Sequence, residues 1–232
     1  MNIIKINKLL SKPLVNLETK IELQFENNVN LLKYKAKTII ELGGVSRPVL
    51  KKSKKYEYVG IDIDNSFEYS EYYDSFFCQS VEYRFPIKGD LIFSKYLMEH
   101  VGDVKLAYKH QIEALNQGGS ILHLYPLGYH PFSLINKFFG NKVSKKFIDL
   151  FRKEHKNITG YPAFYDLGNA YMLEKHLREY DIEVEFIYHY GATDYFSFFF
   201  PFAVCISIFN SFCSTLKLKL FASNVLILIT KK

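Results

Sequence analysis

The chain has 232 residues, the size of one domain or of one domain with additional elements. Hydrophobic residues make up 48% and charged residues 23%, a composition that excludes a disordered protein. Its three cysteines, Cys78, Cys205 and Cys213, form no CxxC pair. This excludes a disulfide scaffold and a cysteine-based zinc site, and it fits a reducing compartment.

The net charge of +6 is modest, and acidic residues are interleaved with the lysines along the chain. Only the run KKSKK at 51–55 approaches the concentrated basic face of a nucleic-acid-binding protein, and we interpret it as a solvated helix end. We therefore expect no nucleic-acid partner. The first 20 residues contain no long apolar stretch, so we expect no cleaved secretion signal.

Residues 1–36 are predicted to form one or two amphipathic helices ahead of a main domain at 37–232. Within this domain, strand-like apolar runs alternate with helical spacing. The predicted strands are 37–42, 57–63, 90–94, 120–126, 182–190 and 223–230, and the predicted helices include 103–116 and 169–180. Strands and helices that alternate at this interval indicate βαβ units and a mostly parallel sheet.

A glycine turn follows the first predicted strand. The strand ends near Glu41, Gly43 and Gly44 come next, and a helix is expected from Ser46. Glycines here let the chain turn sharply and let a ligand approach backbone N–H groups. Asp62 ends the next strand, 21 residues after Glu41, where an acid can accept hydrogen bonds from ribose hydroxyls. Together these features indicate a nucleoside-containing cofactor at the carboxyl ends of the strands.

The glycine pattern narrows the choice of cofactor. A dinucleotide site requires G-x-G-x-x-G, and no third glycine follows Gly44 at the required spacing. Glu41 would also repel a pyrophosphate, whereas it suits a cationic group. S-adenosylmethionine combines a ribose with a sulfonium and an α-ammonium group, so we expect this cofactor.

Several segments occur in the order and at roughly the spacing of a known family: TIIELGG, YVGIDID, GDLIFSKYLMEHV and LNQGGSILHLYP. With them, the chain resembles the class I S-adenosylmethionine-dependent methyltransferases of the broad type-11 group. The segment FYDLGNAYMLEKHLREYDIEVEFIYHY resembles the helix and sixth strand that follow in that family, so the resemblance covers about residues 37–191 and the last strand. It implies an α/β fold with a Rossmann-like, seven-stranded, mostly parallel sheet, helices on both faces and an antiparallel last strand.

The resemblance implies that seven residues bind the cofactor: Glu41, Gly43, Gly44, Asp62, Ile63, Val81 and Ser94. Glu41, Gly43 and Gly44 would line the methionine half of the cofactor. Asp62 would bind the ribose hydroxyls, Ile63 would lie beside the adenine, and Ser94 would face the sulfonium. Val81 lies in the stretch that often contacts the adenine. Val45 and Arg47 stand where the family has further glycines, and 80–82 lacks the usual Asp. A degenerate member without turnover is therefore an alternative.

Methyl transfer needs little acid–base machinery, because the sulfonium is an activated leaving group and the step depends on alignment. A hydroxyl acceptor needs a base, for which His130 and His100 are candidates. A turn role for His130 and a packing role for His100 are equally compatible with the sequence, and His123, inside a strand, is predicted to be structural. Some relatives bind a metal through Glu-x-x-Glu-His; here Tyr96 replaces the first Glu, so we expect no metal site.

Two segments interrupt the alternation of strands and helices. Residues 127–168 form an insertion, which we expect to build the acceptor pocket or a lid. The 22 residues 195–216 carry no charge, which is long enough for a membrane span, but Pro201, Asn210 and the strand expected after them favour an apolar helical excursion at about 195–217. If exposed, it would dock to a membrane surface or a lipid-linked substrate; a buried helix or a dimer interface is the alternative.

The sequence therefore predicts a cytoplasmic, S-adenosylmethionine-dependent methyltransferase that methylates an oxygen or nitrogen of a small molecule, such as a glycan or a lipid-linked sugar. A lipid or quinone methyltransferase, peripheral on the inner face of the membrane, is one alternative. A methyltransferase-like binding or scaffold protein without turnover is another. The oligomeric state stays open.

Overall fold

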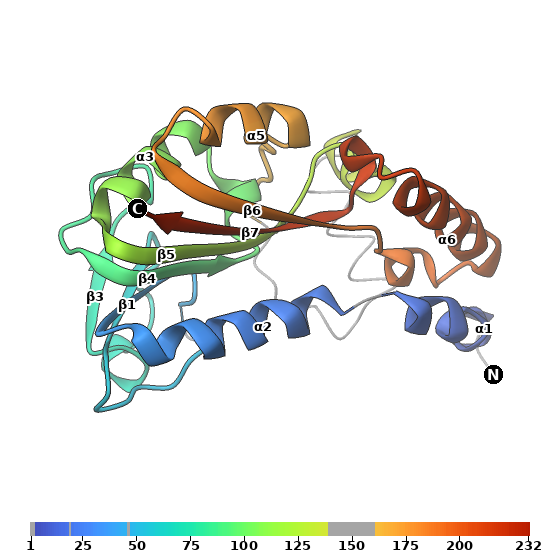
Figure 1. Cartoon of the computed structure of the whole chain (residues 1–232). Helices are drawn as coiled ribbons and strands as arrows, with labels where there is room; N and C mark the ends of the chain where they lie inside the picture. The colour runs from blue at the N-terminus through green and yellow to red at the C-terminus, as the bar shows by residue number, and fades with distance from the viewer. Residues whose placement is uncertain (1–2, 19, 46, 139–160) are drawn as a thin grey trace.

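The structure is a computed structural model, and it describes residues 3–18, 20–45, 47–138 and 161–232. Seven strands form one sheet in the order β3-β2-β1-β4-β5-β7-β6 (Figure 1). They are β1 Thr38–Leu42, β2 Glu57–Asp62, β3 Ser75–Cys78, β4 Gly89–Lys95, β5 Leu115–Pro126, β6 Ile182–His189 and β7 Asn224–Lys231. The pairings from β3 to β5 are parallel, and β7 runs antiparallel to both β5 and β6. This confirms the predicted Rossmann-like sheet with an antiparallel last strand.

Helices cover both faces of the sheet (Figure 1). The described α-helices are α1 Ile3–Leu17, α2 Ile21–Leu32, α3 Val104–Ala114, α5 Ala170–Leu177 and α6 Phe200–Thr215, and residues 131–138 are also helical. The starts of α3 and α5 are set by caps, since Asp103 accepts from the N–H of Leu106 at 2.9 Å and Asn169 from that of Tyr171 at 2.9 Å. No helix in the described ranges is long and apolar enough to cross a bilayer.

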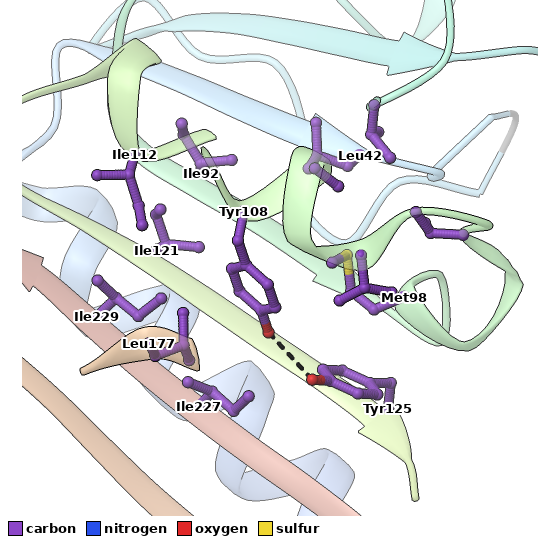
Figure 2. Close-up of a cluster of buried hydrophobic side chains, with 14 of the residues drawn as sticks. Leu42, Ile92, Met98, Tyr108, Ile112, Ile121, Tyr125, Leu177, Ile227 and Ile229 are labelled. Carbon is purple, nitrogen blue, oxygen red and sulfur yellow. Dashed lines mark hydrogen bonds between the residues drawn. The ribbon is translucent and has the colours of Figure 1, made fainter. Parts of the chain in front are cut away.

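The face under α3 and α5 carries the larger core. Ile92 and Ile121 from the sheet pack there with Tyr108 and Leu177 from the two helices (Figure 2). The hydroxyls of Tyr108 and Tyr125 lie 3.1 Å apart inside this core, so both polar ends have a partner. The strand period of two sends alternate residues to opposite faces, which explains why neighbouring residues of β4 belong to different cores.

The opposite face is covered by α2. Phe25 and Val29 of this helix are fully buried against the sheet, and the ring of Phe25 meets that of Phe93 edge-on at 6.2 Å. The N-terminal segment therefore supplies a layer of the fold, whereas α1 lies against α6 at the far end of the molecule (Figure 1).

The structure corrects two expectations and adds one element. The helix expected from Ser46 is wrong for the described residues 43–45 and 47–56, which form turns, bends and an isolated bridge between Ser53 and Tyr56. The interpretation of the basic run 51–55 as a helix end is therefore wrong. Pro48 disfavours a helical conformation at the residue before it, and the N–H of Val49 is bonded to the side chain of Glu41. The short edge strand β3 was not among the predicted strands. Most of the predicted cap insertion, 139–160, lies outside the described residues.

Candidate functional site

The carboxyl ends of β1, β2 and β4 meet at one edge of the sheet, because these strands are parallel neighbours. Leu42 pairs with Ser94 in register, so the turn at Gly43 starts beside the end of β4. Gly43 has φ +77, and a Cβ there would lie 3.0 Å from the side chain of Leu97. This turn therefore needs glycine for both its backbone conformation and its close packing.

Glu41 is enclosed at this edge. Its carboxylate accepts a hydrogen bond from the N–H of Val49 at 3.0 Å and from the hydroxyls of Tyr58 and Tyr73. Burial raises its pKa to about 7, although these hydrogen bonds oppose the rise. A Cβ on Gly44 would collide with the Tyr73 hydroxyl and with this carboxylate. Glu41 thus anchors the loop after β1 from within, and its oxygens are already in use.

Asp62 lies at the end of β2, where the sequence predicted it. Its carboxylate accepts from the N–H of Asp64 at 2.8 Å, and burial raises its pKa. The predicted adenine contacts differ in exposure: Ile63 is 58% exposed, whereas Val81 is buried in the core. Tyr161 belongs to the insertion expected to build the acceptor pocket or a lid, with a packing role as the alternative; burial and the negative charges of Asp64 and Asp62 raise the pKa of its hydroxyl. No spacing in the sequence pointed to this neighbourhood.

Ser94 is fully buried in a chain of polar side chains. Its hydroxyl lies 2.8 Å from Nδ1 of His123, whose Nε2 lies 2.6 Å from the side-chain oxygen of Gln111. Burial lowers the pKa of His123 to about 3, so the imidazole is neutral at physiological pH. The contact predicted between Ser94 and the cofactor stays a prediction, since this hydroxyl is bonded to the sheet interior.

Glu99 follows β4, and its buried carboxylate has one oxygen without a hydrogen bond to the described residues. Its side chain is 6% exposed, and Oε2 has no hydrogen-bond partner among the described residues. Burial raises its pKa to about 8. The N–H groups of Phe164 and Tyr165 bond to its backbone carbonyl, so the segment after residue 161 lies beside it. A polar ligand group would find an open acceptor or acid proton here.

His100 and His130 have different surroundings. The Nδ1 of His100 lies 3.0 Å from the carbonyl oxygen of Pro162, and its Nε2 lies 3.8 Å from Glu99. His130 is fully buried; its Nδ1 accepts from the N–H of Phe132, its Nε2 donates to Asn210 at 3.0 Å, and its pKa falls to about 4 through burial. Both ring nitrogens of His130 are therefore engaged. In the described part of the chain, no three His, Cys, Asp or Glu side chains are grouped so as to hold a metal ion.

Comparison with known proteins identifies the fold. No model of a known protein family matches the sequence, and no curated protein sequence matches it. Solved methyltransferase structures do match its fold. The N-methyltransferase NodS from Bradyrhizobium japonicum WM9 has a TM-score of 0.50 at 11% identity, covering 90% of this chain and 96% of that one.

Two further structures give the same result. The plantazolicin methyltransferase BpumL, solved with a triazolic desmethylPZN analogue and S-adenosyl-L-homocysteine, has a TM-score of 0.50 at 13% identity, covering 96% of this chain and 90% of that one. A methyltransferase from Thermotoga maritima has a TM-score of 0.50 at 14% identity, covering 90% and 89%. The chain therefore has the class I methyltransferase fold.

Proposed function

We propose that this protein is an S-adenosylmethionine-dependent methyltransferase acting on an oxygen or nitrogen of a small molecule. The observation that carries the proposal is the edge itself: a glycine turn after β1 and an acid at the end of β2 lie at the carboxyl ends of a methyltransferase-type sheet. Ligands bind at this edge in open parallel sheets. The fold relative BpumL was solved with the product form of this cofactor.

The residues fit the cofactor in part. Asp62 has carboxylate oxygens that can accept from the ribose hydroxyls, and Gly43, at φ +77, forms the turn that the cofactor would approach. Gly44, Ile63, Val81 and Ser94 are proposed as the remaining cofactor contacts, as the resemblance implies. Glu41 fits less directly, because its oxygens already accept three intramolecular bonds; its role is to hold the loop in place.

The proposed reaction requires few catalytic residues. When bound, S-adenosylmethionine supplies a methyl group whose transfer to the acceptor breaks its bond to sulfur and releases S-adenosylhomocysteine. An acceptor hydroxyl must also lose a proton. Of the two predicted bases, His100 is better placed than His130, because its ring is partly exposed at this edge whereas that of His130 is enclosed.

Calorimetric titration with S-adenosylhomocysteine tests the proposal. We expect micromolar binding that Asp62→Ala weakens at least tenfold, because the ribose hydroxyls lose their acceptor. Asp181→Ala is the matched control, since this aspartate is exposed just before β6 and pairs with Lys232 at 3.8 Å. Equal affinities in both variants would contradict the ribose assignment.

A second candidate is a methyltransferase-like scaffold without turnover. It is favoured by the loop after β1, which is closed on Glu41 and contains no helix in its described residues. A helix at this place would have directed its N-terminal N–H groups at the cofactor. Absence of any S-adenosylhomocysteine binding by a well-folded sample would support this candidate over an enzyme.

A lipid or lipid-linked acceptor is favoured by the apolar surface of α6. Phe202, Ile208 and Phe212 are 53–65% exposed, and at 100° per residue they lie within one third of the helix circumference. Leu216, just after the helix, is 53% exposed. Neighbouring α1 carries Lys5, Lys8 and Lys12 and no acid. We propose a cytoplasmic protein that docks peripherally on the anionic inner face of the membrane.

Vesicle flotation tests this docking. We expect the protein to float with vesicles of phosphatidylglycerol and phosphatidylcholine, and Phe202→Ser with Phe212→Ser to abolish flotation. Leu31→Ser is the control, since this leucine is 68% exposed on α2, away from α6. Failure of the wild type to float would contradict the docking and leave the methyltransferase proposal intact.

A further inference from the structure

A cavity of about 500 Å³ lies at the amino edge of the sheet, opposite the proposed cofactor site. One wall comes from the residues just before β1 and the other from those just before β2. The lining residues are Asn30, Lys33, Tyr34, Ala36, Val49, Leu50, Lys51, Lys52, Ser53, Lys55 and Tyr56. Four are lysines and none is acidic, so the lining is basic, although Lys52 is paired with Asp74 outside the lining.

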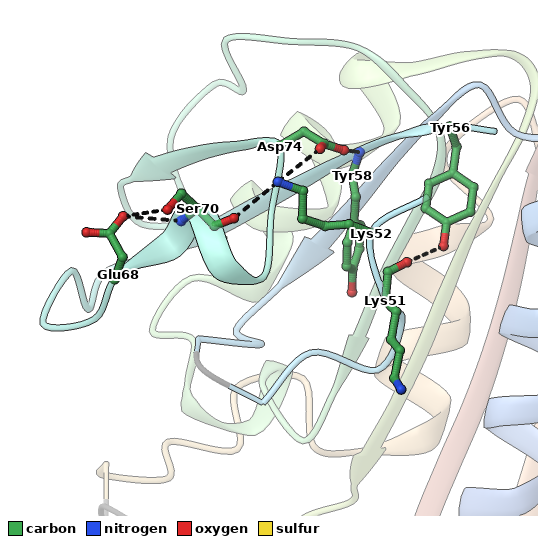
Figure 3. Close-up of polar contacts among 7 residues, drawn as sticks. All are labelled: Lys51, Lys52, Tyr56, Tyr58, Glu68, Ser70 and Asp74. Carbon is green, nitrogen blue, oxygen red and sulfur yellow. Dashed lines mark hydrogen bonds and ion pairs between the residues drawn. The ribbon is translucent and has the colours of Figure 1, made fainter. Parts of the chain in front are cut away.

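Backbone contacts hold the second wall in shape (Figure 3). The hydroxyl of Tyr56 donates to the carbonyl of Lys51 at 2.6 Å, and the N–H of Lys55 donates to the Ser53 hydroxyl at 3.3 Å. Lys52 is bonded to the segment between β2 and β3: its ammonium donates to the Ser70 carbonyl at 3.1 Å and pairs with Asp74 at 3.2 Å. The loop is therefore organised before any ligand arrives.

Two of the lysines have no charged or hydrogen-bonding partner in the part of the chain that the structure describes. Within the described residues, the ammonium groups of Lys51 and Lys55 make no hydrogen bond or ion pair, whereas Lys33 donates to the side chain of Asn30 at 2.5 Å. Like charges gathered around one concavity repel each other, and a ligand with several negative charges would relieve this repulsion. The volume matches that of a small-molecule site.

We propose that this cavity binds a small molecule carrying at least two phosphate groups. Lys51 and Lys55 would contact the phosphates directly, and the Ser53 hydroxyl, which accepts from Lys55 and still has a hydrogen to donate, would bond a phosphate oxygen. The exposed ring of Tyr34 forms the rim, where it can cover the uncharged part of the ligand. The site is separate from the proposed methyl-transfer edge and does not depend on that proposal.

Inorganic pyrophosphate is the probe, titrated by calorimetry into the full chain in 50 mM salt. We expect micromolar binding, binding of orthophosphate at least tenfold weaker, and loss of affinity as salt is raised to 500 mM. Lys51→Glu with Lys55→Glu should weaken pyrophosphate binding at least tenfold. The control pair Lys105→Glu and Lys109→Glu changes the net charge equally on the exposed side of α3 and should leave the affinity within twofold.

Three results would overturn the proposal. The first is absence of pyrophosphate binding by the wild type, and the second is equal weakening by both pairs of substitutions, which would show a net-charge effect. The third is tight binding of a single-stranded RNA that pyrophosphate does not displace, which would assign the lysines to a nucleic-acid surface. Circular dichroism of each variant confirms that it is folded, and Lys51→Gln with Lys55→Gln repeats the test without charge reversal.

Discussion

Replacing Glu99 by Gln should change how the stability of the protein depends on pH. The folded carboxyl keeps its proton up to about pH 8, whereas in the unfolded chain it ionises near its ordinary pKa of 4.5. Between these values the folded state binds one proton more, so stability is fully present below pH 4.5 and falls as the pH rises towards 8. At about 1.4 kcal/mol for each pKa unit, the whole window corresponds to about 5 kcal/mol.

The amide of Gln has nearly the shape of the acid and does not ionise, so Glu99→Gln removes this proton linkage. Urea unfolding at pH 5 and pH 8 measures the free energy of unfolding of both proteins. We expect the stability of the wild type relative to the variant to fall by up to about 4 kcal/mol between the two pH values. Other titrating groups, including Glu41, are present in both proteins and cancel in the difference.

Glu113→Gln, an exposed change on α3 at 44% side-chain exposure, serves as the control and should run parallel to the wild type. If the difference between wild type and Glu99→Gln stays constant from pH 5 to pH 8, the carboxyl is not buried without a partner. Such a result would contradict a proton held on Glu99 in the folded protein.

Two further substitutions test packing at the same edge and at the far end. Gly44→Ala places a methyl group against the Tyr73 hydroxyl and the Glu41 carboxylate, so we expect the free energy of unfolding in urea to fall by about 1–3 kcal/mol. Gly102→Ala is the control and should cost less, because its methyl group meets one carboxylate oxygen at 3.2 Å. His130→Ala should cost about 2–4 kcal/mol through the cavity and the unpaired acceptor of Asn210, with unchanged affinity for S-adenosylhomocysteine. A stable His130→Ala protein that has lost methyl transfer would instead support the predicted base.

The strands of the sheet were predictable where apolar runs ended at turns. The runs at 37–42 and 57–63 became β1 and β2, and Asp62 lies at the carboxyl end of β2. The four residues of β3 give too short a pattern to distinguish from a loop, and their strand conformation depends on pairing with β2. The missing helix after β1 shows a similar limit, because a tertiary contact decides the path of that loop.

The enclosure of Glu41 could not be read from the sequence. Its partners Tyr58 and Tyr73 lie on β2 and just before β3, and only the sheet brings their hydroxyls to one carboxylate. A glutamate ahead of two glycines predicts a ligand contact by position, but the position does not reveal which way the side chain is bonded. The unused oxygen of Glu99 is likewise visible only once its neighbours are in place.

The position of α2 in the sequence affects how the protein folds during synthesis. This helix is synthesised before the strands it packs on, and Ile21, Phe25 and Val29 find their partners only when β1, β4 and β5 exist. Until then the helix has no sheet face to pack on, and in the folded protein it covers that face together with residues such as Leu50 and Tyr73. A shortened chain that begins at residue 37 would expose Phe93, Leu122 and Leu124 and should aggregate rather than fold.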